Sequence, residues 1–242
     1  MYILILALPV VARARLVDEL LASYDSVKSV SCEVRRTSWM SEKKMKSLSR
    51  VHYQKPDRIH VDSFAPIKRR HVADGKRLYY YVAGDPLGFS RPVNELDENW
   101  LISLRKVPAT AMEHLLKIGA AKEDKLSAGT GYFARCGYKT DKPYIVLSLV
   151  ATNKLQLVEY YETPKMENLL LRCEYKQFEE VLPGVWFSLH QETKLNFKGI
   201  ESRETVQFLN VSVNKPIAKS LFNHEYYFRK VKFVDDFEEI YK

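Results

Sequence analysis

Residues 51–62 read Val-His-Tyr-Gln-Lys-Pro-Asp-Arg-Ile-His-Val-Asp, and residues 68–81 read Lys-Arg-Arg-His-Val-Ala-Asp-Gly-Lys-Arg-Leu-Tyr-Tyr-Tyr. Two turn signals divide this stretch. Pro56 fixes its own φ and keeps the preceding residue out of the helical region. Asp74-Gly75 is the kind of pair that tight hairpin turns favour. The stretch therefore predicts three short strands at the centre of a curved antiparallel meander.

Strand patterns run through most of the chain. Ile59 and Val61 share one face of their strand, while Arg58, His60 and Asp62 share the other, as in a half-buried strand. Similar segments recur about every ten to twelve residues, the spacing of a continuous meander. About eleven strands are expected, at 30–35, 48–53, 58–62, around 68–71, and at 77–82, 132–136, 144–150, 155–161, 169–178, 185–195 and 204–213.

Three segments have helical patterns instead. Residues 16–27 place apolar side chains at a 3/4 spacing, which makes one apolar face. Residues 97–106 and 109–118 form a central pair, and the second of them follows Pro108 and precedes Gly119, as helix starts and stops commonly do. One sheet of this length must curl. The sequence predicts a mainly β (α+β) fold, an unclosed antiparallel β-barrel whose concave apolar face is covered by helices and suits an apolar ligand.

The N-terminus is apolar over residues 2–11 and continues as Ala12-Arg13-Ala14. About ten apolar residues are too few to span a bilayer, which needs roughly 20. They fit the core of a signal peptide, and Ala12 and Ala14 have the small-x-small form of a cleavage site. We expect a signal peptide over 1–14 and a single domain over 15–242. A buried first strand is the alternative, because the positively charged start of a signal peptide is missing.

The charge balance is basic, with 38 Lys and Arg against 30 Asp and Glu and a net charge of +8. Either the surface is simply solvated or the partner is anionic, such as a membrane surface or a lipid head group. The densest basic cluster, Lys68-Arg69-Arg70-His71, lies within an expected strand. Strand alternation sends its side chains to opposite faces, so nucleic-acid binding is not expected.

Cysteine and histidine spacings point to no catalytic or metal site. Cys32, Cys136 and Cys173 all fall in expected strands, where a free thiol packs as a small apolar group. A disulfide between the last two is the alternative. The three histidines of residues 51–71 match no zinc-binding spacing, and no nucleophile elbow or phosphate-binding loop is present. We expect neither a cofactor nor an enzymatic activity.

The opening stretch resembles a known family. Tyr53-x-Lys55-Pro56-Asp57-Arg58-Ile59 followed by Asp74-Gly75-Lys76-x-Leu78-x-x-Tyr81 is similar to the signature of LolA-like proteins, which include periplasmic outer-membrane lipoprotein carriers and lipoprotein-sorting proteins. Leu182-Pro183-Gly184-Val185-Trp186-Phe187 and Asn210-Val211-x-Val213-Asn214-x-Pro216-Ile217 extend the likeness toward the C-terminus. It is the order of these motifs that carries the resemblance.

The resemblance implies a β-barrel that is not closed, with an α-helical lid near 16–27 and 97–118 over a cavity for the acyl chains of lipoproteins or another lipid. Such a carrier works as a periplasmic monomer between an inner-membrane exporter and an outer-membrane receptor. This chain is longer, richer in tyrosine and more basic than a typical carrier. A LolA-like envelope protein with a regulatory or scaffolding role and no cargo is therefore the alternative, and an enzyme acting on an envelope component is a third interpretation.

Strand alternation and the resemblance together assign site residues. Arg58 falls where the motif has its strand arginine, which in carriers ties the lid to the barrel; a sheet-face partner for Asp62 is the alternative. The expected cavity wall consists of inward-facing apolar residues of the strands and two lid residues: Val34, Ile59, Val61, Leu78, Tyr80, Val146, Leu157, Leu171, Phe187 and Phe208, with Met112 and Leu116 from the lid.

Overall fold

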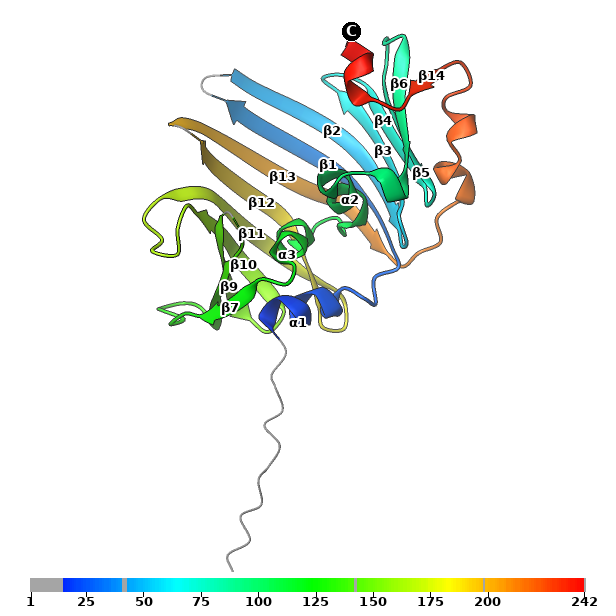
Figure 1. Cartoon of the computed structure of the whole chain (residues 1–242). Coiled ribbons are helices and arrows are strands. Elements are labelled where there is room, and N and C mark those ends of the chain that lie inside the picture. The colour runs from blue at the N-terminus through cyan, green and yellow to red at the C-terminus, as the bar shows by residue number, and fades with distance from the viewer. Residues whose placement is uncertain (1–14, 41–42, 142, 198, 242) are drawn as a thin grey trace, which may run out of the picture.

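The computed structural model describes residues 15–40, 43–141, 143–197 and 199–241. The signal peptide expected over residues 1–14 lies outside this part of the chain. The described residues form one curved, unclosed sheet of fourteen strands (Figure 1). In chain order these are β1 (Ser29–Met40), β2 (Lys43–Gln54), β3 (Arg58–Ala65), β4 (Arg69–Asp74), β5 (Arg77–Val82), β6 (Leu87–Pro92), β7 (Lys122–Lys125), β8 (Ala134–Lys139), β9 (Tyr144–Ala151), β10 (Lys154–Tyr161), β11 (Leu169–Leu182), β12 (Val185–Phe197), β13 (Ile200–Val213) and β14 (Lys232–Val234).

The order of the strands joins two meanders. Across the sheet it runs β14-β6-β5-β4-β3-β2-β1-β13-β12-β11-β10-β9-β8-β7. The join is the antiparallel pairing of β1 with β13, which extends from Val30 opposite Val213 to Met40 opposite Ser202. The long strands β1, β2, β12 and β13 therefore form the middle of the sheet. The unclosed sheet expected from the sequence is confirmed, whereas the predicted number of eleven strands is wrong.

Each of the three strands that the prediction missed has a weak sequence pattern. β6 contains Gly88 and ends at Pro92, two residues that argue against a strand. β7 consists of four charged residues, which suit an exposed edge strand. β14 has three residues and pairs in parallel with β6. The sheet is therefore mixed at that edge rather than antiparallel throughout.

Three α-helices, α1 (Leu16–Ser23), α2 (Glu98–Arg105) and α3 (Met112–Ile118), cross the concave face of the sheet (Figure 1). Each begins and ends within the range that the sequence predicts. Asp97 caps α2, because its carboxylate accepts a hydrogen bond of 3.0 Å from the backbone N–H of Trp100. Within the described residues, no helix combines the length and the apolar character that a membrane span requires.

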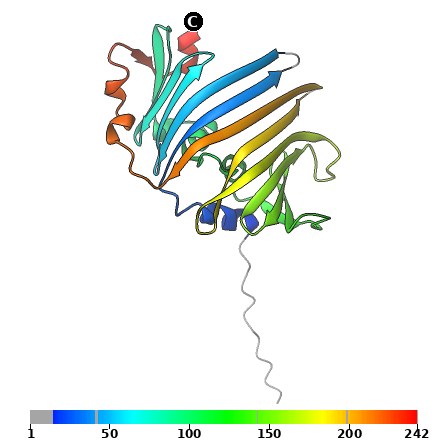
Figure 2. The same ribbon diagram turned by 180° about the vertical axis from the view of Figure 1, so that it is seen from behind.

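The C-terminal segment wraps around one edge of the sheet (Figure 2). Its short turns η2 (Lys219–Phe222) and η3 (His224–Tyr226) lie on the convex face against β3 and β4. After β14, the turn η4 (Phe237–Tyr241) brings Phe237 to the apolar cluster around Tyr80 on the other face. The chain end thus contacts both faces of this half of the sheet.

Two apolar clusters fill the concave side. The larger lies beneath α1 and α3 and includes Val17, Leu20 and Leu115, all fully buried. The smaller lies beneath α2 and includes Leu104. A short turn, η1 (Val93–Glu95), leads from β6 to α2 and adds to the smaller cluster. The helices are therefore packed directly on the sheet by their apolar faces.

Candidate functional site

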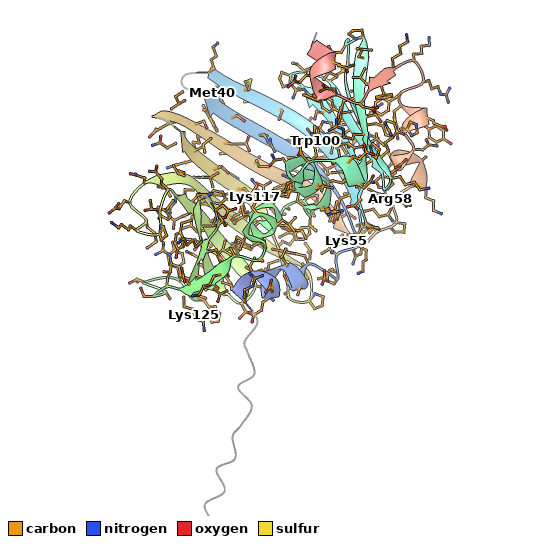
Figure 3. The ribbon with its side chains drawn as sticks, in the orientation of Figure 1. Met40, Lys55, Arg58, Trp100, Lys117 and Lys125 are labelled. Carbon is orange, nitrogen blue, oxygen red and sulfur yellow. The ribbon has the colours of Figure 1, made fainter. Side chains whose placement is uncertain are left out.

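The concave face divides into a covered part and an open part. Beneath the helices, side chains such as Val30 and Tyr53 are almost completely buried. Beyond the helices, toward Met40, the long central strands carry no helical cover (Figures 1 and 3). Here polar side chains join the face: Glu204 accepts a hydrogen bond of 3.0 Å from Ser38 and lies 3.5 Å from the Arg36 guanidinium. The apolar and polar parts meet along the edge of the helical layer.

Most residues of the expected cavity wall lie on this concave face. Val34 and Phe208 face each other across the β1–β13 pair. They are half-buried and pack against the larger cluster, as do Leu171 and Met112, and Phe187 is fully buried within it. A second group lies beneath α2 in the smaller cluster, consisting of Ile59, Leu78 and Tyr80.

Val61 lies between the two clusters. It is opposite Val51 on one side and His71 on the other, and the His71 ring contacts Tyr80 with centroids 4.7 Å apart. Leu116 of α3 is half-buried. The expected cavity wall is therefore split over two neighbouring subsites, with Val61 between them.

Val146 and Leu157 lie on the other face of the sheet. Val146 is opposite Glu159 and Leu157 is opposite Ser148 and Glu174, whereas their neighbours Leu147 and Val158 point into the larger cluster. For Leu157, the cause is a register shift between Leu155 and Leu157 that interrupts the alternation. Val146 and Leu157 therefore do not lie on the concave face with the other residues of the expected cavity wall, and their predicted placement is corrected.

The covered part is held by an ion pair between a turn and a helix. Arg105, the last residue of α2, reaches Asp57 in the β2–β3 turn, with Nε–Oδ1 and Nη2–Oδ2 distances of 2.9 and 3.3 Å. The Tyr53 hydroxyl also donates to the Arg105 carbonyl at 3.1 Å. Arg58, expected to contact the lid, instead donates to the Asp74 carbonyl at 3.2 Å. The acid of the Lys-Pro-Asp-Arg motif, and not its arginine, makes the contact with the helix.

A second polar cluster fixes α3. His114 is buried, and its Nδ1 lies 2.9 Å from the Tyr160 hydroxyl on β10. Burial lowers the pKa of His114 to about 4. Burial of Glu113 opposes its ionisation, but the nearby Lys106, His114 and Lys117 together outweigh this effect and lower the pKa of the carboxyl to about 2. At neutral pH α3 is thus held by a neutral imidazole and an ionised carboxylate.

A separate pocket lies where the convex face meets the C-terminal segment. It has a volume of about 300 Å³ and includes Arg70, Tyr81 and Phe228 among its lining residues. Arg70 is already paired with Asp62 and lies 4.5 Å from the centre of the Tyr227 ring. The sheet separates this pocket from the helix-covered face.

The described residues offer no metal centre, since they contain no group of three or more His, Cys, Asp or Glu side chains arranged to hold an ion. Cys32, Cys136 and Cys173 are buried and are not joined in disulfides. Burial raises the pKa of Cys32 to about 12, so this thiol stays protonated at neutral pH. The expected burial of the thiols is confirmed, and the alternative, a disulfide between Cys136 and Cys173, is not formed.

Solved structures of low sequence identity share this architecture. A DUF1329 family protein from Desulfovibrio piger has a TM-score of 0.59 at 11% identity, over 87% of this chain and 97% of that one. A LolA superfamily protein from Nitrosomonas europaea has a TM-score of 0.56 at 12% identity, over 88% and 100%. The fold is LolA-like.

A putative outer membrane lipoprotein-sorting protein domain from Vibrio parahaemolyticus shares the LolA-like fold with a TM-score of 0.59 at 11% identity, over 87% of this chain and 96% of that one. No family model matches the chain, and no curated protein matches it by sequence. The likeness therefore concerns the fold, as the ordered motifs of the sequence predicted.

Sequence reasoning missed the partners that hold the helices. Arg105 and Asp57 are 48 residues apart, and no local pattern links them. Trp100 of α2, which stacks on Phe89 with ring centroids 5.8 Å apart, was likewise not singled out. The available signals were an acidic residue, Asp57, in an expected turn and the basic residue at the end of an expected helix.

Proposed function

We propose that this LolA-like protein is a periplasmic carrier that binds the acyl chains of lipoproteins, or of another lipid, on its concave face and moves them toward the outer membrane. An inner-membrane exporter and an outer-membrane receptor would be its partners. The protein acts by binding and release rather than by catalysis, and it works as a monomer. The support comes from the LolA-like fold together with the apolar concave face.

The observation that carries this proposal is that apolar side chains which pack against the larger cluster on the concave face remain half-buried. Val34, Phe208 and Leu171 are neither sealed in the core nor fully exposed. An acyl chain laid along them would enter the apolar part of the face while its polar end stayed near Arg36 and Ser38. Each methylene moved out of water contributes about 0.8 kcal/mol.

Deeper binding requires α2 and α3 to move, because Leu104 of α2 and Leu115 of α3 occupy the apolar face beneath them. These helices have eight and seven residues, and helices so short depend on their packing for stability. The polar contacts of Arg105 and Lys106 lie at the accessible side of the layer, with both side chains more than a third exposed. Opening is therefore expected to cost little compared with unfolding of the sheet.

Titration with a dansylated fatty acid tests the proposal. Saturable binding is expected, and Phe208→Asp should weaken it at least tenfold, because a charge at this half-buried position is poorly solvated when a chain covers it. Tyr226→Ser, which removes an exposed aromatic side chain of the C-terminal segment, should leave binding unchanged. Absence of binding by the wild type, or equal binding by folded Phe208→Asp protein, would contradict the carrier function.

One observation favours a second candidate. The larger apolar cluster is filled by side chains of the protein's own helices, which is the arrangement expected of an envelope regulator or scaffold without cargo. Native mass spectrometry of protein purified from its host distinguishes the two. A bound acylated peptide or phospholipid supports the carrier, whereas an unliganded protein that also rejects the fatty acid supports the scaffold.

A further inference from the structure

Two β-hairpins end side by side at one edge of the curved sheet. Met40 at the end of β1 is opposite both Lys43 of β2 and Ser202 of β13, and Ser202 is in turn opposite Leu195 of β12. The β1–β2 and β12–β13 ends therefore form a continuous margin at the open end of the concave face (Figure 1). We call this margin the hairpin rim and define its apolar members as Trp39, Met40, Met45, Leu195 and Ile200.

The hairpin rim exposes large apolar side chains to solvent. Met40 is 64% exposed, Ile200 59% and Met45 57%, and Leu195 is 39% exposed. Single exposed apolar residues are common on protein surfaces, but neighbouring ones on adjoining hairpins form a contiguous patch that marks an interaction site. Here the patch lies at the protruding ends of long strands, away from the helices (Figure 3).

Basic side chains surround this patch. Lys43, Lys44 and Lys46 are exposed on β2, and Lys194 and Arg203 on β12 and β13. Lys44 and Arg203 both lie 5.4 Å from the centre of the Trp39 ring. The sequence of the two hairpin ends contains four acidic residues: Glu42, Glu201, Glu192, which lies 3.8 Å from Arg203, and Glu204, which is paired with Arg36. The rim therefore carries a net positive charge.

We propose that the hairpin rim docks onto the surface of an anionic phospholipid bilayer, with Met40 and Ile200 inserted at head-group level and the lysines against lipid phosphates. Protruding apolar tips ringed by lysine suit a fluid anionic interface, where Trp is also favoured. Protein interfaces are instead depleted of lysine. Docking goes beyond the proposed carrier function and needs no bound acyl chain. It would place the open end of the concave face against the membrane.

Vesicle flotation tests the docking with the full chain. Vesicles of phosphatidylcholine with 30% phosphatidylglycerol should carry the protein, and vesicles of phosphatidylcholine alone should carry at least tenfold less. The variants Met40→Ser/Ile200→Ser and Lys43→Glu/Lys44→Glu should each reduce binding to the anionic vesicles at least tenfold. All four side chains are exposed, so an unchanged thermal midpoint will show that the variants are folded.

Matched controls remove an aromatic and a basic residue at a distance from the rim. Phe133 is 62% exposed just before β8, and Lys125 is exposed on β7, far from Met40 in Figure 3. Phe133→Ser/Lys125→Glu should bind as the wild type does. Addition of anionic vesicles should also shift the fluorescence of Trp39 to shorter wavelength, a shift that Trp39→Phe abolishes.

Three results would overturn the proposal: no flotation with anionic vesicles, equal flotation by the rim variants, or an equal loss in the control. Concentration-dependent self-association that the rim variants abolish, without any vesicle binding, would assign the rim to a second copy of the chain instead. A failure of fatty-acid binding would leave the docking result unaffected, because the vesicle assay uses protein without added cargo.

Discussion

Asp57 and Arg105 join the turn at the start of the fold-defining meander to the end of α2, with two nitrogen–oxygen contacts of 2.9 and 3.3 Å. Asp57 is mostly buried, with 19% of its side chain exposed, while Arg105 is 52% exposed. Such a half-exposed pair stabilises by no more than about 1 kcal/mol. It is therefore strong enough to bias the position of α2 and weak enough to be broken by a ligand.

Arg105→Ala is expected to loosen α2 without unfolding the protein. Loss of about 1 kcal/mol corresponds to roughly a fivefold increase in local opening. Hydrogen exchange of the α2 amides and the association rate of the fatty acid should both rise by about this factor. Arg58→Ala is the matched control, because Arg58 bonds to the Asp74 carbonyl and not to α2. Equal effects of the two variants would show that the ion pair does not restrain the helix.

Stability should fall as the pH drops below 6.5, in part because of His114. Its pKa is about 4 in the folded protein and 6.5 when unperturbed, so the unfolded state takes up the proton first. This contribution to stability is fully present above pH 6.5 and is lost as the pH falls toward 4. Burial is the main cause; nearby Lys106 and Lys117 also lower the pKa, and Glu113 opposes them.

Urea unfolding at several pH values checks this expectation. Between pH 4.5 and 6.5 the free energy of unfolding should depend less steeply on pH in His114→Gln than in the wild type, by up to about one proton per molecule. The low pKa of Glu113 acts only below about pH 4.5, so it does not interfere. His71 is perturbed in the same direction, and its contribution cancels in the comparison. Identical slopes would show that His114 is not buried in its neutral form.

Gly88→Ala should release the C-terminal edge strand. A Cβ at position 88 would lie 2.6 Å from the Phe233 ring and 3.0 Å from the Tyr80 carbonyl oxygen. The ring would have to move, which should destabilise the β6–β14 pair by about 1–3 kcal/mol. Limited proteolysis should then cleave after β14 more rapidly. Adding Phe233→Ala makes room for the methyl group, so Gly88→Ala should accelerate cleavage less in a Phe233→Ala background than in the wild type. An equal acceleration in the two backgrounds would contradict a steric cause.

Glu159 is the buried centre of a charge network on the convex face. Its carboxylate lies 3.0 Å from Arg135 and 3.2 Å from Arg172, and its side chain is 5% exposed. Glu159→Ala should destabilise the protein by about 1–3 kcal/mol, because it leaves both guanidinium groups without this partner. Glu174→Ala, at a more exposed partner of Arg172, should cost less. Chemical denaturation measures both, and an equal cost would show that burial does not decide the effect.

Local patterns predicted the helices and eleven of the fourteen strands, but not the contacts between helices and sheet. Alternation placed Val34, Ile59 and Phe208 on the concave face because each strand there has one polar side. It failed for Val146, since its neighbours in β9 are also apolar and both faces of that strand are buried. Nothing in residues 55–58 shows which side chain will meet a helix that begins 40 residues later. Such contacts depend on how the sheet curls. The curvature cannot be predicted from a short segment of the sequence.

The pairing of β1 with β13 has a consequence for how the protein is made. Residues near 30 complete the centre of the sheet only when residues near 213 arrive. Long-range pairing of this kind makes folding slow, and during synthesis the first meander lacks its neighbour on the β1 side until most of the chain has emerged. We therefore expect the two halves of the sheet to join only late in synthesis, after residues near 213 have emerged.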